Sequence, residues 1–110
     1  MSKRGNKLYL EDIKDSIGKI ESYVNSMSFE DFSKDLKTID AVVRNLTIIG
    51  EAGSNLSPEL KSKNSDVPWD EIAGMRNKVV HEYFGVDEEI LWKTIKEDFP
   101  EFKKLLSKLL

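Results

Sequence analysis

Apolar residues recur at spacings of three and four along most of this chain of 110 residues. Such spacing gathers apolar side chains on one face of an α-helix, whereas a half-buried strand would show strict alternation. The first series consists of Leu10, Ile13, Ile17, Ile20, Val24 and Met27, with largely polar residues between its members. It predicts a helix with one apolar seam that packs in the core of a helical bundle.

A second helical pattern begins after Ser28, which is followed three residues later by Asp31. An N-cap serine with an acidic residue at the third helical position is close to a capping box. Helical spacing then continues through Phe29, Phe32, Leu36, Ile39, Val43 and Leu46. These signals predict one long helix that begins at about Phe29 and extends to about Ala52.

The second half of that helix carries more apolar residues than one face needs, namely Ala41, Val42, Val43, Leu46, Ile48, Ile49 and Ala52. Either the bundle centre or a second subunit could bury them, and the pattern leaves both open. A homodimer interface would use Val42, Ile48 and Ile49. Arg44 and Glu51 share a face, where a solvated or salt-bridged strip is favoured over a contribution to a cleft.

Residues 53–67 form the one clear break in the helical pattern, with raised Gly, Ser, Asn and Pro content. We expect them to link helices within one domain. Ser57 followed by Pro58 can start a short helical turn, with the proline in the first helical position. Pro68 then opens a third long helix, for which Gly85 is the expected C-terminal stop.

The last helix is predicted to begin after Asp87, which precedes two glutamates as an N-cap does. Its apolar face consists of Ile90, Leu91, Ile95, Phe99, Phe102, Leu105, Leu106 and Leu109. Pro100 interrupts this face, so we expect a kink, or a restart capped by Asp98. Together the patterns predict an all-α fold in a single domain over residues 1–110: an antiparallel bundle of four long helices plus a short helical turn.

Composition excludes several kinds of site. The chain has no cysteine and one histidine, which excludes disulfides, Cys-ligated zinc and a His-rich metal site within one subunit. We expect no metal and no cofactor. No signal-peptide core or membrane-spanning run is present, which predicts a soluble, cytoplasmic protein. The net charge of −3 and pI near 5.2 argue against a broad electrostatic surface for nucleic acid.

Polar residues gather around the only histidine, in the stretch from Arg76 to Tyr83. Its guanidinium, amide, imidazole and phenol can exchange protons near neutral pH and stabilise negative charge, as metal-independent work on a phosphodiester requires. On an ideal helix Asn77 and His81 share a face. Arg76 and His81 lie about 140° apart. Their convergence needs the long arginine side chain, a loosened last turn or a second subunit.

A purely structural interpretation of the same stretch is favoured by physics alone. Histidine in a last helical turn interacts well with the negative end of the dipole, and Asn77 can satisfy the ring of His81. Arg76 can pack its stem while its head reaches water. Tyr83 can be a half-buried ring with a solvated hydroxyl. Local chemistry alone therefore favours a helix end over a site.

Two longer blocks add a resemblance. AVVRNLTIIGEA (residues 41–52) and PWDEIAGMRNKVVHEYFGVD (residues 68–87) closely resemble the HepT-like branch of the HEPN superfamily. The family signature R-x4-H-x-Y is complete as Arg76, His81 and Tyr83. The resemblance covers nearly the whole chain, and the two blocks in order make it far more specific than the short signature.

The resemblance implies a helical homodimer with a cleft at its interface, acting as a metal-independent endoribonuclease. Such proteins are the toxins of type II toxin–antitoxin pairs. Arg76, Asn77 and His81 would be the catalytic residues, with His81 as general acid or base. The partners would be an RNA substrate and a nucleotidyltransferase-fold antitoxin, which in some members transfers AMP to the tyrosine that matches Tyr83.

Two other functions stay open. One is a non-catalytic helical dimer that binds a nucleotidyltransferase subunit or a nucleotide, with the motif serving recognition only. The other is a purely structural bundle, in which substitution of Arg76 or His81 would change neither toxicity nor partner binding.

Overall fold

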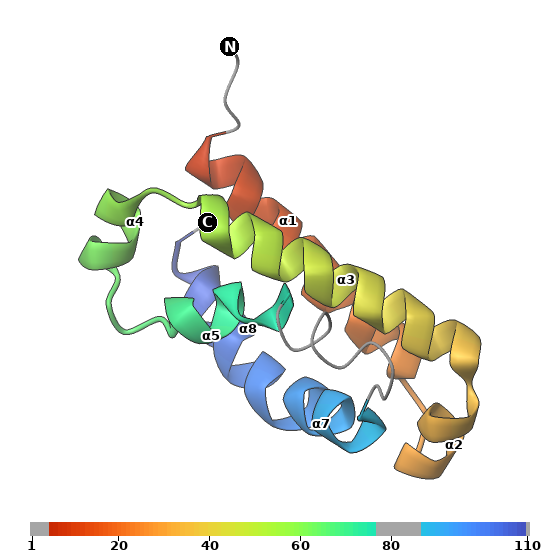
Figure 1. Cartoon of the computed structure of the whole chain (residues 1–110). Coiled ribbons are helices and arrows are strands. Elements are labelled where there is room, and N and C mark those ends of the chain that lie inside the picture. The colour runs from red at the N-terminus through yellow and green to blue at the C-terminus, as the bar shows by residue number, and fades with distance from the viewer. Residues whose placement is uncertain (1–4, 77–86, 110) are drawn as a thin grey trace.

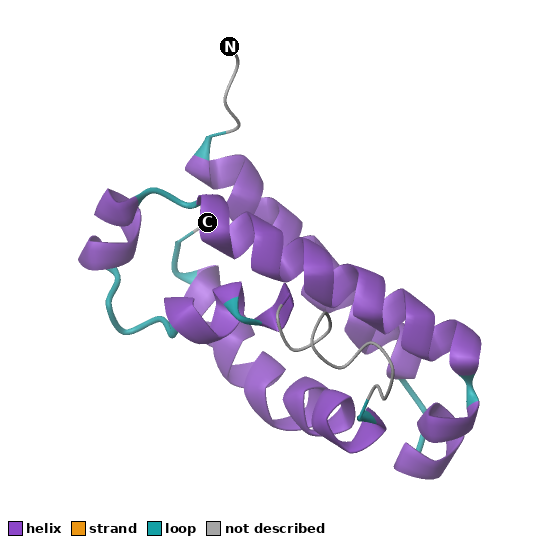
Figure 2. Cartoon of the chain, viewed as in Figure 1, coloured by secondary structure: helices purple, strands orange, loops and turns teal. Residues whose placement is uncertain are grey.

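The computed structural model describes residues 5–76 and 87–109, and within those ranges every regular element is helical (Figure 1, Figure 2). The two longest helices, α1 (Asn6–Val24) and α3 (Leu36–Asn55), lie side by side and run in opposite directions (Figure 1). The predicted seam of α1 is buried, from Leu10 to Val24. The expected all-α fold is therefore confirmed, although the described residues do not show four continuous long helices.

The helix predicted from Phe29 to Ala52 is two helices, because the chain breaks at Asp35. α2 spans Phe29–Lys34 and begins with the predicted capping box of Ser28 and Asp31. Asp35 has a non-helical backbone (φ −102°, ψ 88°), and its carboxylate accepts a hydrogen bond from the backbone N–H of Thr38 at 3.0 Å. It thus caps the start of α3. The apolar spacing runs through this break without interruption, which is why periodicity alone misses it.

This cap makes stability depend on pH. The backbone N–H of Thr38, and then its side chain, donate hydrogen bonds that lower the pKa of Asp35. The contribution is present above the unfolded-state pKa and is lost as the pH falls through the lower folded-state pKa. We expect Asp35→Ala to lower Tm at pH 7 and Asp35→Asn, which keeps an acceptor, to preserve it. Below about pH 4 the parent should lose Tm relative to Asp35→Asn; parallel Tm–pH curves would contradict the assignment.

Short elements follow α3. α4 (Pro58–Lys63) is the predicted helical turn, and the Ser57 side chain accepts a hydrogen bond from the backbone N–H of Leu60. α5 (Trp69–Ala73) begins after Pro68, as predicted. The expectation of one long helix from Pro68 is wrong within the described residues, because a turn at Gly74 separates α5 from the helical conformation of Met75 and Arg76. The expected stop at Gly85 lies outside the described residues.

The C-terminal part folds back beneath α1 and α3 (Figure 1). α7 (Glu88–Lys93) is capped by Asp87, as predicted. A π-helical segment, Thr94–Asp98, then leads into α8 (Phe99–Ser107). The backbone N–H of Phe99 donates to the Thr94 carbonyl, and the wider turn accommodates Pro100, which has no N–H. The predicted irregularity at Pro100 is therefore a π-helical segment and not a restart, because Asp98 keeps helical dihedrals (φ −87°, ψ −39°) and makes no side-chain cap within the described residues.

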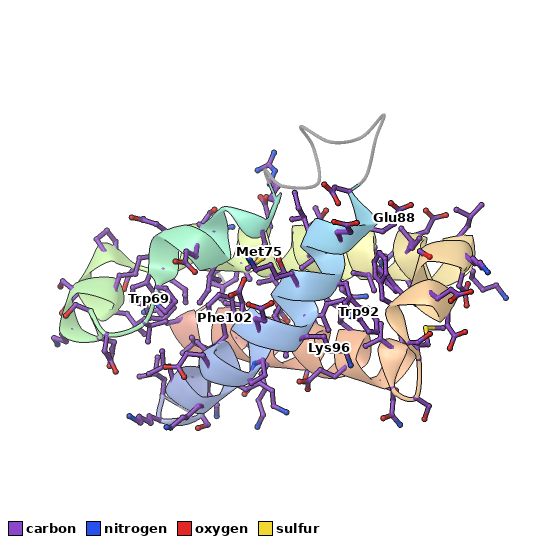
Figure 3. All side chains as sticks on the ribbon, turned by 90° about the horizontal axis from the view of Figure 1, so that it is seen from below. Trp69, Met75, Glu88, Trp92, Lys96 and Phe102 are labelled. Atoms are coloured by element: carbon purple, nitrogen blue, oxygen red, sulfur yellow. The ribbon has the colours of Figure 1, made fainter. Side chains whose placement is uncertain are left out.

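Aromatic residues attach α2 to α7. The ring of Trp92 lies 6.1 Å from that of Phe29 and 5.2 Å from that of Phe32, between centroids. Lys96 Nζ, from the π-helical segment that follows α7, lies 4.7 Å from the centroid of the Trp92 ring (Figure 3). The core itself continues between the helices through Trp69, Ile72, Met75, Phe99 and Phe102.

No helix in the described ranges is long and apolar enough to cross a membrane.

The apolar surplus of α3 is mostly explained within one chain. Val42 and Ile49 are fully buried (0% exposed), whereas Ile48 is half-buried. Both fully buried residues belong to the hydrophobic core, and α1 and α5 both pack on α3. The expectation that Val42 and Ile49 supply a dimer surface is therefore wrong, and the reason is that a second neighbour inside the chain packs on α3.

Candidate active site

Arg76 is the predicted site residue that the structure places. It follows Met75, which is fully buried (0% exposed) and points into the core between the helices (Figure 3). The Arg76 side chain is 53% exposed. A buried methionine thus anchors the chain directly before an arginine whose guanidinium reaches the surface.

The backbone at Arg76 lies against α3 at Gly50. A Cβ atom added to Gly50 would lie 2.5 Å from the Arg76 backbone nitrogen and 2.7 Å from the Arg76 Cβ. One turn later, a Cβ atom at Gly53 would lie 2.9 Å from Ile72 Cγ2. No side chain larger than hydrogen fits between the two backbones at Gly50. These glycines allow α3 and the α5 segment to approach closely, and so fix where Arg76 leaves the core.

The guanidinium of Arg76 is paired with a carboxylate of α3. Arg76 Nη1 lies 2.8 Å from Glu51 Oε2, and the Glu51 side chain is 57% exposed. The preferred expectation for Glu51, a salt-bridged surface position, is confirmed. Its partner is Arg76, 25 residues along the chain, whereas Arg44 is exposed. The pair places a charged, hydrogen-bonded group at the surface where the motif begins.

The other predicted site residues, Asn77, His81 and Tyr83, lie outside the described residues. Whether Arg76 and His81 converge therefore stays a prediction. Within the described ranges no group of three or more His, Cys, Asp or Glu side chains is placed to hold a metal ion.

Two features of α3 and its surroundings were missed from the sequence. A hollow of about 290 Å³ borders the ion pair and is lined by Tyr9, Asp12, Ile48, Glu51 and Ala52. Asn45, 4% exposed, donates from Nδ2 to the Ala41 carbonyl, while its Oδ1 has no partner among the described residues. The sequence carried a signal for a third feature, the close approach of α3 to the backbone of Arg76: Gly50 stands in the middle of an apolar helix.

Comparison with known proteins assigns the chain to a family. The family model described as "Ribonuclease HepT-like" matches residues 13–109. A protein of Thermococcus cleftensis named "Probable ribonuclease HepT" is 50% identical over 107 residues, which cover 97% of each chain. A protein of Caldanaerobacter subterraneus named "Putative RNase TTE0752" is 49% identical over 102 residues, 93% of this chain and 91% of its own. No solved structure was found to match. The chain therefore belongs to the HepT-like ribonuclease family.

Proposed function

We propose that this protein is a metal-independent endoribonuclease whose catalytic residues are Arg76, Asn77 and His81. The observation that carries the proposal is the family match over residues 13–109, which includes the complete Arg76, His81, Tyr83 pattern. The half-exposed guanidinium of Arg76, held at the surface by α3, supports it. A guanidinium so placed can donate two parallel hydrogen bonds to a phosphate.

The chemistry is transesterification within RNA. The ribose 2′-oxygen attacks the adjacent phosphorus as its proton leaves, and the departing 5′-oxygen gains a proton. His81 accepts the first proton or donates the second, and water exchanges the other. The P–O5′ bond breaks, leaving a 2′,3′-cyclic phosphate on one fragment and a 5′-hydroxyl on the other. Arg76 stabilises the charge that develops on the phosphoryl oxygens. Asn77 orients the phosphate or the imidazole.

The purified protein is expected to cut RNA in buffer containing EDTA. Denaturing gel electrophoresis should show fragments that end in 2′,3′-cyclic phosphate. An RNA with 2′-deoxyribose at the cut site is the matched control, because it lacks the nucleophile. Cleavage of that control, or activity that appears only after a divalent cation is added, would refute the mechanism.

The net charge of −3 favours a short, structured RNA as substrate over an enzyme that tracks along a strand.

The active form is proposed to be a homodimer with a shared cleft. Support comes from the ideal helical separation of Arg76 and His81, about 140°, which a second subunit can bridge. Ile48 remains half-buried beside Glu51 and can contribute to such an interface. Sedimentation equilibrium should give twice the chain mass; a monomer at micromolar concentration would remove the dimer from the proposal.

The protein is further proposed to act in the cytoplasm as the toxin of a type II pair. Its antitoxin would have the nucleotidyltransferase fold and would transfer AMP from ATP to the Tyr83 hydroxyl, releasing pyrophosphate. A bulky anion two residues from His81 would block the cleft and repel RNA phosphates. Mass spectrometry after incubation with the antitoxin and ATP should show AMP on the parent and none on Tyr83→Phe.

The acidic balance of the chain, pI near 5.2, favours a second candidate function. In this alternative the dimer has no catalytic activity and binds a nucleotidyltransferase subunit or a nucleotide. A pull-down should then recover the nucleotidyltransferase encoded by the neighbouring gene, while the purified protein cuts no RNA in EDTA.

A further inference from the structure

Two consecutive residues of α3 contact two different parts of Arg76. Gly50 lies against its backbone, where an added Cβ atom would come within 2.5 Å of the Arg76 nitrogen. Glu51 lies at its head, with Oε2 2.8 Å from Nη1. The first contact fixes the origin of the side chain, and the second fixes the direction of its tip. A side chain held at both ends has little freedom left.

The ion pair is poorly suited to a role in stability. Both side chains are more than half exposed, 53% for Arg76 and 57% for Glu51, and exposed ion pairs contribute little to folding because water screens them. Orientation is a different matter. Arginine has many rotamers, and a guanidinium aligned before substrate arrives need not be ordered during the reaction.

The contact also leaves the guanidinium able to bind an anion. Glu51 engages Nη1, whereas an arginine has five N–H donors arranged in a planar fork. Two donors on another edge suffice for a phosphate. Three other ion pairs among the described residues, Lys34–Glu30, Lys63–Glu59 and Lys103–Glu21, involve no residue of the motif.

We propose that Glu51 is a positioning residue: it holds the Arg76 guanidinium, through Nη1, in the orientation that receives the RNA phosphate. This inference rests on the proposed ribonuclease function. Glu51 itself does not touch the reacting atoms, so its removal should slow the reaction without changing the fold.

The test compares Glu51→Ala with Glu30→Ala, which removes the same charge from another exposed ion pair. For Glu51→Ala we expect kcat for RNA cleavage in EDTA to fall by about ten- to a hundredfold, with an unchanged Tm. Glu51→Gln, which keeps an oxygen acceptor, should recover part of that loss. Glu30→Ala should match the parent. In an Arg76→Ala background, Glu51→Ala should cause no further loss, because the two residues act as one unit.

Several results would overturn the proposal. An unchanged kcat in Glu51→Ala would show that Glu51 does not position Arg76. Faster cleavage would show that Glu51 competes with the phosphate for the guanidinium. If Glu51→Ala causes the same loss of kcat in the Arg76→Ala background, Glu51 does not act through Arg76.

A readout independent of cleavage is the NMR signal of the Arg76 Nε–H group, assigned with Arg76→Lys. Glu51→Ala should shift it; if the parent cuts no RNA but the shift occurs, the ribonuclease assignment fails and the contact stands. An unmoved signal refutes the contact.

Discussion

Replacing His81 by alanine is expected to lower kcat for RNA cleavage by about 10²–10⁴-fold. The chain contains one histidine, so no other side chain of the motif titrates near neutral pH and can replace it as proton acceptor or donor. The loss should appear in kcat more than in KM, because the proton moves only in the transition state. Single-turnover cleavage in EDTA measures it directly.

The matched variants separate proton transfer from charge stabilisation. Arg76→Ala should cost about 10²–10³-fold, and Arg76→Lys should recover part of this, since lysine keeps the charge but not the planar fork. Tyr83→Phe should cut RNA at close to the parent rate, because Tyr83 is assigned to modification and not to catalysis. If His81→Ala cleaves as fast as the parent, the mechanism is wrong. Circular dichroism of each variant verifies that the fold is intact.

Local signals predicted much of the helical architecture. Ser28, Ser57 and Asp87 each cap a helix where the sequence indicated one. These predictions succeed because a cap depends on a side chain and on amides three residues away. The break at Asp35 was missed for the opposite reason: Phe32 and Leu36 keep helical spacing on both sides of it, so apolar periodicity carries no sign of the interruption.

Packing between distant segments was not predictable in the same way. The apolar residues of α3 allowed either a second subunit or a neighbour within the chain. The neighbours lie within the chain, and one of them is α5, which begins more than ten residues after α3 ends. It packs on α3, and Val42 and Ile49 are buried without a partner chain. Periodicity states that a face is buried but does not state what covers it.

The candidate site also combines a residue that local sequence signals predict with one that depends on packing between distant segments. The motif identified Arg76 from the sequence, because its residue types and spacing resemble a known family. The carboxylate that pairs with it, Glu51, lies 25 residues earlier, and its proximity depends on how closely α3 and the segment after α5 approach. That approach is set by Gly50 and Gly53, whose role becomes visible only when the two backbones are placed together.

A series of glycine-to-alanine substitutions tests this approach. Gly18 is exposed on α1, and an added Cβ atom there would meet nothing within 4 Å. Gly18→Ala should therefore raise the free energy of unfolding by about 0.5–1 kcal/mol, the usual gain within a helix. At Gly50 the Cβ atom would overlap the Arg76 backbone nitrogen at 2.5 Å. Gly50→Ala should lower the free energy of unfolding by about 1–3 kcal/mol, measured by urea denaturation.

Gly53→Ala distinguishes backbone from side-chain overlap. Its Cβ atom would meet Ile72 Cγ2 at 2.9 Å, whereas the nearest backbone atom, the Ala73 nitrogen, lies 3.4 Å away. A side chain can rotate to relieve the overlap, so the cost should fall between those of the other two variants. Cleavage should follow a different order: Gly50→Ala moves the origin of Arg76 itself and should lose kcat beyond its loss of stability, while Gly53→Ala should not. Equal kcat in the two variants would show that Gly50 sets the packing of the helices but not the position of the arginine.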